Sequence, residues 1–395
     1  MFLFQVGLLA LLCFVNIQLI NSSCQNSFVV ICDNLSDVPY NPKRKTWSEL
    51  LIQQKDYNDD KPRYTLTSLQ LNRDLSNLKW LIIIQQLSQI QKNAFTYCKN
   101  LQQLILYGNN LPTIKKQTFV GFRNLLKLAL ENNNIDHLEK NAFVLSTIEV
   151  LDLSYNQIQL LPTDLFKKCK ITTLKITNNR LWNVELYSLP RDLKNLHLDG
   201  NSLNSLPQEI NNLKQLEELT VSNNKLDNVP NLDQLTSLKK LDLSFNGIQT
   251  VSSEFNSLRN LKYLDLSSNK IEKFIFTAPF IQNIKDQFFL LLAHNKLRNL
   301  DLRRIQNTEI TTTLFGNPWN CKCMDAIFQL IRNHNITTTA CDSRIFAAGK
   351  NPYCIVDDNP SCSEEKIPNY VLDNFVKACN DSICDIFNDI DIFVK

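Results

Sequence analysis

The chain has 395 residues, of which 21% are charged, and its formal net charge at pH 7 is only +3. This near balance argues against a nucleic-acid-binding protein, which normally carries a strong basic excess on one face. The length alone favours two or three domains, but the repeats described below predict one continuous core instead.

Residues 1–22 are predicted to be a secretory signal. The run from residue 2 to residue 20 is almost wholly apolar, small polar residues follow it, and cysteines begin directly afterwards. The alternative is a membrane anchor, since the run approaches spanning length. We expect cleavage of the signal and a secreted, extracellular product with no membrane span after its removal.

Residues 23–65 are predicted to form an amino-terminal cysteine cap. Cys24 and Cys32 precede the repeats, and a polar insertion over residues 41–63 separates them from the first expected strands. Leucines at 66 and 71 favour an extra cap strand, because their spacing to Leu78 is too short for a full repeat.

Within residues 66–317 one spacing returns eleven times: apolar residues at the first, fourth and sixth positions and Asn at the ninth. The clearest copies begin at Leu216, Leu238 and Leu261, and successive copies start 22 to 26 residues apart. A fixed period of this size is the signature of a solenoid. The alternation around Asp265 predicts a short strand in each copy, and strands repeated in this way must be parallel.

Two further positions of each repeat are predicted to face inward. The ninth-position Asn is expected to form a ladder that bonds to the backbone, because an unpaired buried amide is costly. Phenylalanines further along are expected to line the back of the core, at positions 95, 119, 143, 166 and 255. The long repeat from Leu261 adds Phe274, Phe276, Phe280 and Ile281, which either fill the core or form an exposed patch for a partner.

The outward face of the strands is the predicted binding surface. Exposed aromatic residues among charges resemble interface anchors, and the candidate partner-binding residues are Trp80, Tyr107, Asp152, Tyr155, Lys175, His197, Phe245 and Tyr263. The fifth position of the repeat is apolar in the first three copies, polar from Asp152 to Asp265, and apolar again at Leu291. We therefore predict that a partner contacts the region from Trp80 to His197.

Residues 318–365 are predicted to be a carboxy-terminal cysteine cap, which contains Cys321, Cys323, Cys341, Cys354 and Cys362. Zinc binding by Cys321, Cys323, His334 and Cys341 is the rival interpretation. Export favours disulfides instead, so no metal and no cofactor is expected.

Two cysteines, Cys98 and Cys169, lie inside the array three repeats apart and are expected to be buried free thiols. Eleven cysteines remain after the signal, and an odd number cannot all pair within one chain.

Residues 366–395 form a tail whose apolar residues have helical spacing. It is expected to pack back onto the cap, or alternatively to be a docking segment that makes a disulfide-linked dimer. Sequons predict N-glycosylation at Asn34, Asn335 and Asn380.

The LxxLxLxxN pattern resembles that of extracellular leucine-rich repeat proteins such as Toll ectodomains, Slit proteins and small proteoglycans. Residues 315–336 resemble the carboxy-terminal cysteine cap of this family, and residues 24–39 resemble its amino-terminal cap. The resemblance implies an α/β solenoid, a horseshoe of about eleven repeats with a parallel concave sheet, disulfide caps and partner binding on the concave face.

The resemblance also implies disulfide pairings. Cys24 would pair with Cys32, Cys323 with Cys362, and Cys321 with either Cys341 or Cys354.

No Ser or Cys beside a His suggests an activated nucleophile, and no glycine-rich phosphate loop is present, so we do not expect an enzyme. The predicted function is a secreted recognition protein for a protein or glycan ligand, in immunity or signalling, as a soluble receptor-like factor or decoy. The alternative is a matrix or adhesion component, held by disulfides.

Overall fold

The computed structural model describes residues 29–32, 48–53, 64–66, 75–143, 148–166, 169–184, 189–284, 287–301, 309–320, 336–338 and 354–355. The signal segment, the tail, the sequons and all cap cysteines other than Cys32 and Cys354 lie outside these residues. Only the backbone is described for those two cysteines, in β1 and β22, so the predicted disulfides stay predictions.

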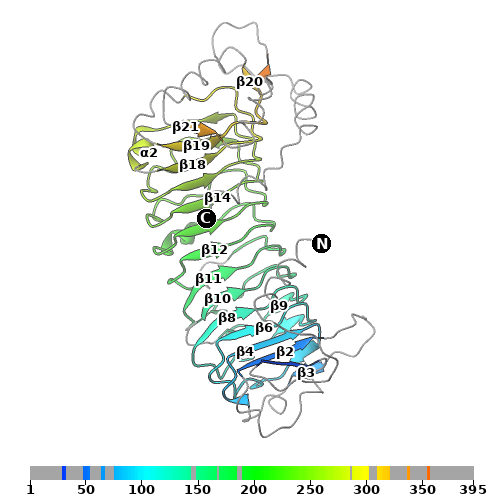
Figure 1. Cartoon of the computed structure of the whole chain (residues 1–395). Coiled ribbons are helices and arrows are strands. Elements are labelled where there is room, and N and C mark those ends of the chain that lie inside the picture. Colours follow the sequence, from blue (N-terminus) through cyan, green and yellow to red (C-terminus); the bar gives the residue numbers. More distant parts are fainter. Residues whose placement is uncertain are drawn as a thin grey trace.

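The described residues form a curved solenoid built on one 14-stranded parallel sheet (Figure 1). The strands of this sheet, in spatial order, are β1 (Val29–Cys32), β2 (Glu49–Gln53), β4 (Trp80–Ile84), β6 (Gln103–Ile105), β8 (Leu125–Ala129), β10 (Ile148–Asp152), β11 (Ile171–Lys175), β12 (Asn195–His197), β13 (Glu218–Thr220), β14 (Lys240–Asp242), β16 (Tyr263–Asp265), β18 (Phe288–Leu291), β19 (Ile310–Thr313) and β21 (Ile336–Thr338). All eleven predicted strands are present, and the predicted parallel horseshoe is confirmed.

Short secondary strands pair on the return side of the coils. These two-stranded sheets join β3 (Tyr64–Leu66) to β5 (Leu87–Ile90), β7 (Thr113–Ile114) to β9 (His137–Leu138), β15 (Thr250–Val251) to β17 (Lys273–Phe274), and β20 (Trp319–Asn320) to β22 (Cys354–Ile355). Helices in the described return segments are short, as in α2 (Ala278–Asn283) and the 3₁₀-helix η5 (Gln208–Asn212). The return segments are too short for a long helix, so the described part of the solenoid is almost wholly strand and turn.

The sheet extends past the predicted array at both ends. The polar insertion that was predicted between the amino cap and the first strands itself contains a strand of the main sheet, because β2 lies inside it, in register with β4. Leu50 and Ile52 of β2 are fully buried. These two alternating side chains bury apolar surface as the leucines of a full repeat do. The sequence position that corresponds to the ninth-position Asn is occupied by Lys55.

The asparagine ladder is confirmed by its hydrogen bonds. At Asn156, Nδ2 donates to the carbonyls of Leu130, Leu153 and Ser154, and Oδ1 accepts from the amides of Asn133 and Ile135. The bond to a carbonyl of the preceding coil recurs in the coils of Asn109, Asn133, Asn156, Asn179, Asn201, Asn224, Asn246, Asn269, Asn295 and Asn317. Each amide therefore joins neighbouring coils while satisfying the backbone at the turn.

Stacked phenylalanines line the back of the amino half of the core. The ring centroids of Phe95 and Phe119 are 6.0 Å apart, and those of Phe119, Phe143 and Phe166 follow at 5.7 Å intervals. In the long repeat Phe274, Phe276 and Phe280 are buried and Ile281 is half-buried against them. These residues therefore fill the core, as the first of the two interpretations expected.

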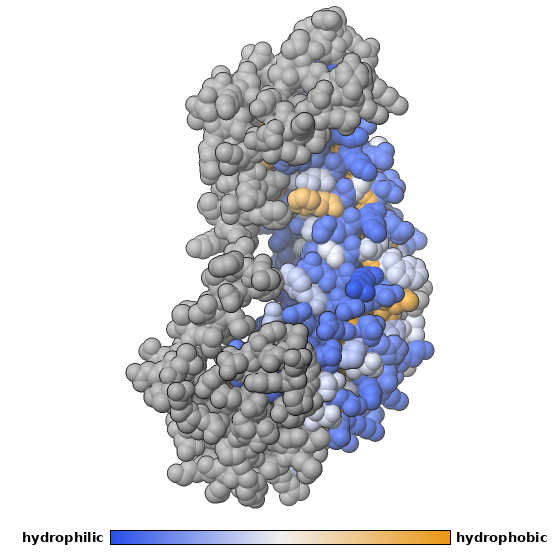
Figure 2. Space-filling view, turned by 90° about the vertical axis from the view of Figure 1, so that its right-hand side faces the viewer, coloured by the Kyte–Doolittle hydropathy of each residue, from blue (hydrophilic) through white to orange (hydrophobic). Residues whose placement is uncertain are grey.

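The apolar residues are concentrated inside the coils. On the face shown in Figure 2, the described surface is mostly hydrophilic, with a few hydrophobic spots. Cys98 and Cys169 are buried free thiols, as predicted, and burial raises the pKa of Cys98 to about 12. No helix within the described ranges is long and apolar enough to cross a membrane.

Candidate functional site

The main sheet places the outward side chains of neighbouring coils in straight rows. Across β10 to β16 the fifth-position residues are paired in register, and they are Asp152, Lys175, His197, Thr220, Asp242 and Asp265. Adjacent parallel strands lie about 4.8 Å apart, so each of these side chains lies beside its counterparts in the next coils. Charges far apart in the sequence therefore act on one another across the face.

The eighth position of every predicted repeat has a left-handed backbone. The positive φ angles occur at Gln85, Gly108, Asn132, Tyr155, Asn178, Gly200, Asn223, Phe245, Ser268, His294 and Gly316. This conformation turns the chain off the strand, and it favours Gly and Asn because a side chain with Cβ is strained there. Tyr155 and Phe245, with φ of 57° and 52°, are bulky exceptions, and their side chains are 43% and 39% exposed.

Tyr155 belongs to a group that we call the amino cluster, formed by Tyr107, Glu131, Asp152 and Tyr155 on adjacent coils. Glu131 and Asp152 share a side-chain hydrogen bond, and burial together with Asp152 raises the pKa of Glu131 to about 7. Lys127 and Lys175 act in the opposite direction. Glu131 therefore takes up a proton more readily than an ordinary carboxyl group, and in that form it can donate its hydrogen to Asp152.

Phe245 belongs to a second group, the carboxy cluster, formed by Asp242, Phe245, Tyr263 and Asp265. Asp242 Oδ1 accepts hydrogen bonds from Ser244 N at 2.9 Å and Ser244 Oγ at 2.7 Å. Asp265 Oδ1 accepts from Ser267 N at 2.8 Å. Burial and the charge of Asp265 raise the pKa of Asp242 to about 7, and burial also raises the pKa of Asp265.

His197 lies between the two clusters in a hydrogen-bonded chain. Its Nδ1 lies 3.1 Å from Thr220 Oγ1, and Thr220 donates its hydroxyl hydrogen to Asp199 Oδ2. Since the Thr220 hydrogen is used in this way, Nδ1 carries a proton and Nε2 of a neutral ring is left as an acceptor. Burial lowers the pKa of His197, which keeps the ring neutral near pH 7.

The predicted site residues occupy different depths of this face. Tyr155 and Phe245 are exposed, whereas Trp80, Tyr107, Lys175, His197 and Tyr263 are half-buried. Asp152 and Asp265, which were predicted at outward positions of the strands, are only 5% and 4% exposed. Both lie between flanking strands, and each accepts a hydrogen bond from the backbone amide two residues further along the chain.

Sequence reasoning missed the partners of these acids. Asp199 accepts from Thr220 and Ser222 of the next coil, and it was not among the predicted residues. The sequence does contain a pattern that indicates the partners of Asp152, Asp242 and Asp265, because Asp-Leu-Ser recurs at residues 152–154, 242–244 and 265–267. An Asp two residues before a Ser on one strand face predicts the bond that is found at each of these places.

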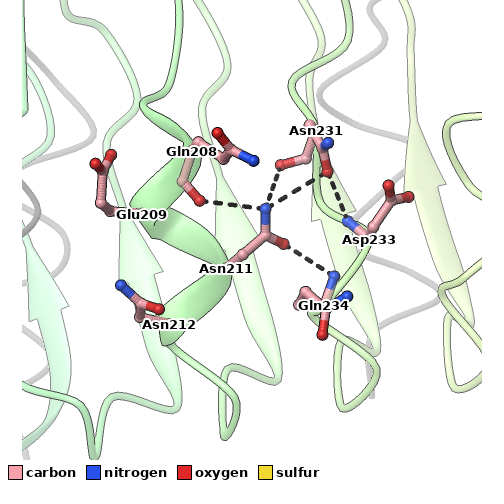
Figure 3. A pocket seen from close by; sticks show the side chains of 7 residues that line it. All are labelled: Gln208, Glu209, Asn211, Asn212, Asn231, Asp233 and Gln234. Carbon is pink, nitrogen blue, oxygen red and sulfur yellow. Dashed lines mark hydrogen bonds between the residues drawn. The ribbon is translucent and has the colours of Figure 1, made fainter.

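The return side carries one polar hollow of about 410 Å³ between η5 and the next coil (Figure 3). It is lined by Gln208, Glu209, Asn211, Asn212, Asn231, Asp233 and Gln234. Asn211 Nδ2 donates to the carbonyls of Gln208 and Asn231, and its Oδ1 accepts from Gln234 N. This amide is fully used in joining two coils, so the hollow is a structural feature of the return side.

No cluster of three or more His, Cys, Asp or Glu side chains suited to a metal occurs in the described part of the chain. The cysteine cluster proposed as a rival zinc site, with His334, lies outside it.

Three family models match the sequence. Residues 73–189 match the BspA type leucine rich repeat region, residues 191–248 match a leucine rich repeat model, and residues 236–277 match a two-copy leucine rich repeats model. No curated protein matches the sequence as a whole.

Solved structures with the same fold are distant in sequence. The leucine-rich repeat domain of APL1B is 21% identical, with a TM-score of 0.58 over 90% of this chain and 93% of its own. Drosophila Toll, in complex with Spatzle, is 18% identical with a TM-score of 0.54 over 77% of this chain. TLR13, in complex with ssRNA13, is 21% identical with a TM-score of 0.56 over 78% of this chain.

The alignments cover 49% of the Toll chain and 52% of the TLR13 chain, so this protein spans about half the length of those structures. At such identities the likeness concerns the fold alone. Together with the repeat spacing, the asparagine ladder and the matched models, it establishes that the chain is a leucine-rich repeat protein.

Proposed function

We propose that this chain is a secreted recognition protein that binds a protein partner on its concave sheet, as a soluble receptor-like factor in immunity or signalling. The observation that carries the proposal is the pair of exposed aromatic side chains, Tyr155 and Phe245, at backbone positions where bulky residues are strained. Strained conformations persist where function requires them, and Tyr and other aromatic residues supply much of the energy of interfaces.

Several features support export and recognition together. The apolar amino terminus and the twelve cysteines favour an oxidising compartment. Leucine-rich repeat folds commonly serve as interaction scaffolds, and Toll is bound to a protein, Spatzle, in its solved complex. A protein partner suits this face better than a nucleic acid, because the paired carboxylates of both clusters repel phosphate.

Affinity capture with the purified mature chain, followed by binding measurements on the recovered partner, tests the proposal. Combining Tyr155→Ala with Phe245→Ala should weaken binding by at least about 30-fold, corresponding to ~2 kcal/mol for interface anchors. The matched control combines Leu160→Ala with Trp182→Ala, which are also exposed but follow the asparagine turns and lie off the strands. The control should leave affinity unchanged.

Equal affinity of the anchor variant and the wild type would place the binding site elsewhere. Retention of the native protein in a matrix fraction, released only by reductant, would favour the adhesion alternative. Export itself is checked by expressing residues 1–395 in a secreting cell and measuring how much protein reaches the medium.

A further inference from the structure

The carboxy cluster contains two carboxylates that form no ion pair with a Lys, Arg or His among the described residues. Asp242 and Asp265 are paired in register on β14 and β16. Asp242 uses only Oδ1 in its bonds to Ser244, and Oδ2 accepts no hydrogen bond from the described residues. Asp265 Oδ2 has one long contact, 3.4 Å from the Tyr263 hydroxyl.

The nearest lysine is already engaged. Lys240 Nζ lies 2.9 Å from Glu218 Oε1 and 5.5 Å from the centre of the Tyr263 ring, and it reaches Asp265 only as a distant charge. Asp199 adds a further negative charge toward Asp242. Two neighbouring buried carboxylates without a cation are costly, so a positive group from outside would stabilise them.

A second observation points to a ligand at the same place. The hydroxyl of Ser267, a residue that is only 1% exposed, makes no hydrogen bond of ordinary geometry with the described residues, although it lies near enough to Asp265 to help lower the pKa of that carboxyl group. Ser267 lies two residues after Asp265, so both side chains project from the same face of the sheet. A buried hydroxyl beside two carboxylates is suited to complete the hydrogen bonds of an incoming donor.

Aromatic rings frame this position. Tyr263 packs against Phe289 with ring centroids 6.3 Å apart, and the exposed Phe245 lies three residues after Asp242 in the same coil. Guanidinium groups bind carboxylates through paired hydrogen bonds and stack on aromatic rings. The chemistry of the carboxy cluster therefore fits arginine better than any apolar or anionic group.

We propose that Asp242, with Asp265 behind it, receives an arginine side chain of the protein partner, whose stem packs on Phe245 and Tyr263. This inference rests on the proposed function and names the chemistry that the concave face recognises. The amino cluster is not an equivalent site, because Glu131 and Asp152 are hydrogen-bonded to each other.

Fluorescence anisotropy with the full mature chain tests the proposal directly. The probe is a labelled Gly-Arg-Gly-Arg-Gly peptide, compared at fixed ionic strength with its citrulline isostere, which keeps the shape but lacks the charge. We expect the arginine peptide to bind at least tenfold more tightly. Asp242→Asn should weaken its binding at least fivefold, while the control Glu149→Gln, an exposed acid at the second position of β10, should not.

Asp242→Asn keeps the oxygen that accepts from Ser244, so the fold should survive, and circular dichroism checks this. Asp265→Asn is the second variant, with an expected loss in the same direction. Equal binding of both peptides, or unchanged binding by Asp242→Asn, would overturn the inference. Calcium binding at micromolar concentration that is lost in Asp242→Asn and blocks the peptide would replace it with a metal site.

The captured partner separates this inference from the proposed function. If Tyr155→Ala with Phe245→Ala abolishes partner binding but Asp242→Asn does not, the concave site stands and the arginine contact is wrong. If neither variant changes partner binding, both proposals fail.

Discussion

The amino and carboxy clusters contain nearly the same side chains but differ in how their acids are satisfied. In both clusters an Asp bonds to the residue two positions on, but Glu131 is also hydrogen-bonded to Asp152, whereas no hydrogen bond between described residues joins Asp242 to Asp265. Glu131 and Asp152 therefore bond to each other, whereas Asp242 and Asp265 have carboxylate oxygens left that can accept hydrogen bonds from a ligand. Hydrogen-bond partners, more than residue types, therefore determine which part of a repetitive face can bind a cation.

The largest predicted effect tests whether both regions share the same scaffold. Asn156→Leu and Asn246→Leu each remove three bonds to carbonyls and leave backbone groups unpaired. We expect each to lower the free energy of unfolding by about 3 kcal/mol, despite the added apolar surface. Urea unfolding measures this, with Lys225→Ala, at an exposed residue, as a surface control. A variant as stable as the wild type would show that the ladder is not needed in that region.

The next largest predicted effect is a change of stability with pH, and it compares Glu131 of the amino cluster with Asp242 of the carboxy cluster. The folded-state pKa of both Glu131 and Asp242 is about 7, above the usual value of about 4 in an unfolded chain. The folded state therefore holds extra protons, so the stability that these groups contribute is complete below about pH 4 and is lost as pH rises through 7.

Asp242→Asn and Glu131→Gln should each reduce the loss of stability between pH 5 and pH 8 by about 1–2 kcal/mol. Because the two sites are several coils apart, the double variant should show the sum of the two effects. Unfolding free energies at the two pH values test this. A wild-type protein whose stability does not fall over this range would contradict the burial of both acids.

The smallest predicted effect concerns the strained aromatic residues. Asn stands at the same left-handed position in the coils of Asn132, Asn178 and Asn223. Tyr155→Asn and Phe245→Asn should therefore preserve the free energy of unfolding or raise it by up to about 1 kcal/mol, while partner binding is lost. Trp182→Asn, which lies outside this position, is the control. Clear destabilisation by either variant would mean that the ring serves packing.

Much of the scaffold follows from the sequence because its causes lie within one repeat. The apolar spacing around Leu264 predicts a strand with buried leucines, and the position of Asn269 predicts an amide at a turn. Repetition then forces parallel stacking, since one coil cannot bury its own leucines. The eleven predicted strands and the buried Phe274, Phe276 and Phe280 illustrate how reliable this reasoning is.

The tertiary structure decided the rest, because it depends on contacts between coils. Nothing within one repeat shows that Asp265 is buried, that Asp199 accepts a hydrogen bond from Thr220, or that Glu131 is hydrogen-bonded to Asp152. The strand β2 was hidden because Lys55 replaces the marker Asn, and only its register with β4 shows that it belongs to the sheet. Burial and pairing of polar groups are properties of neighbouring coils, and the sequence of a single coil does not contain them.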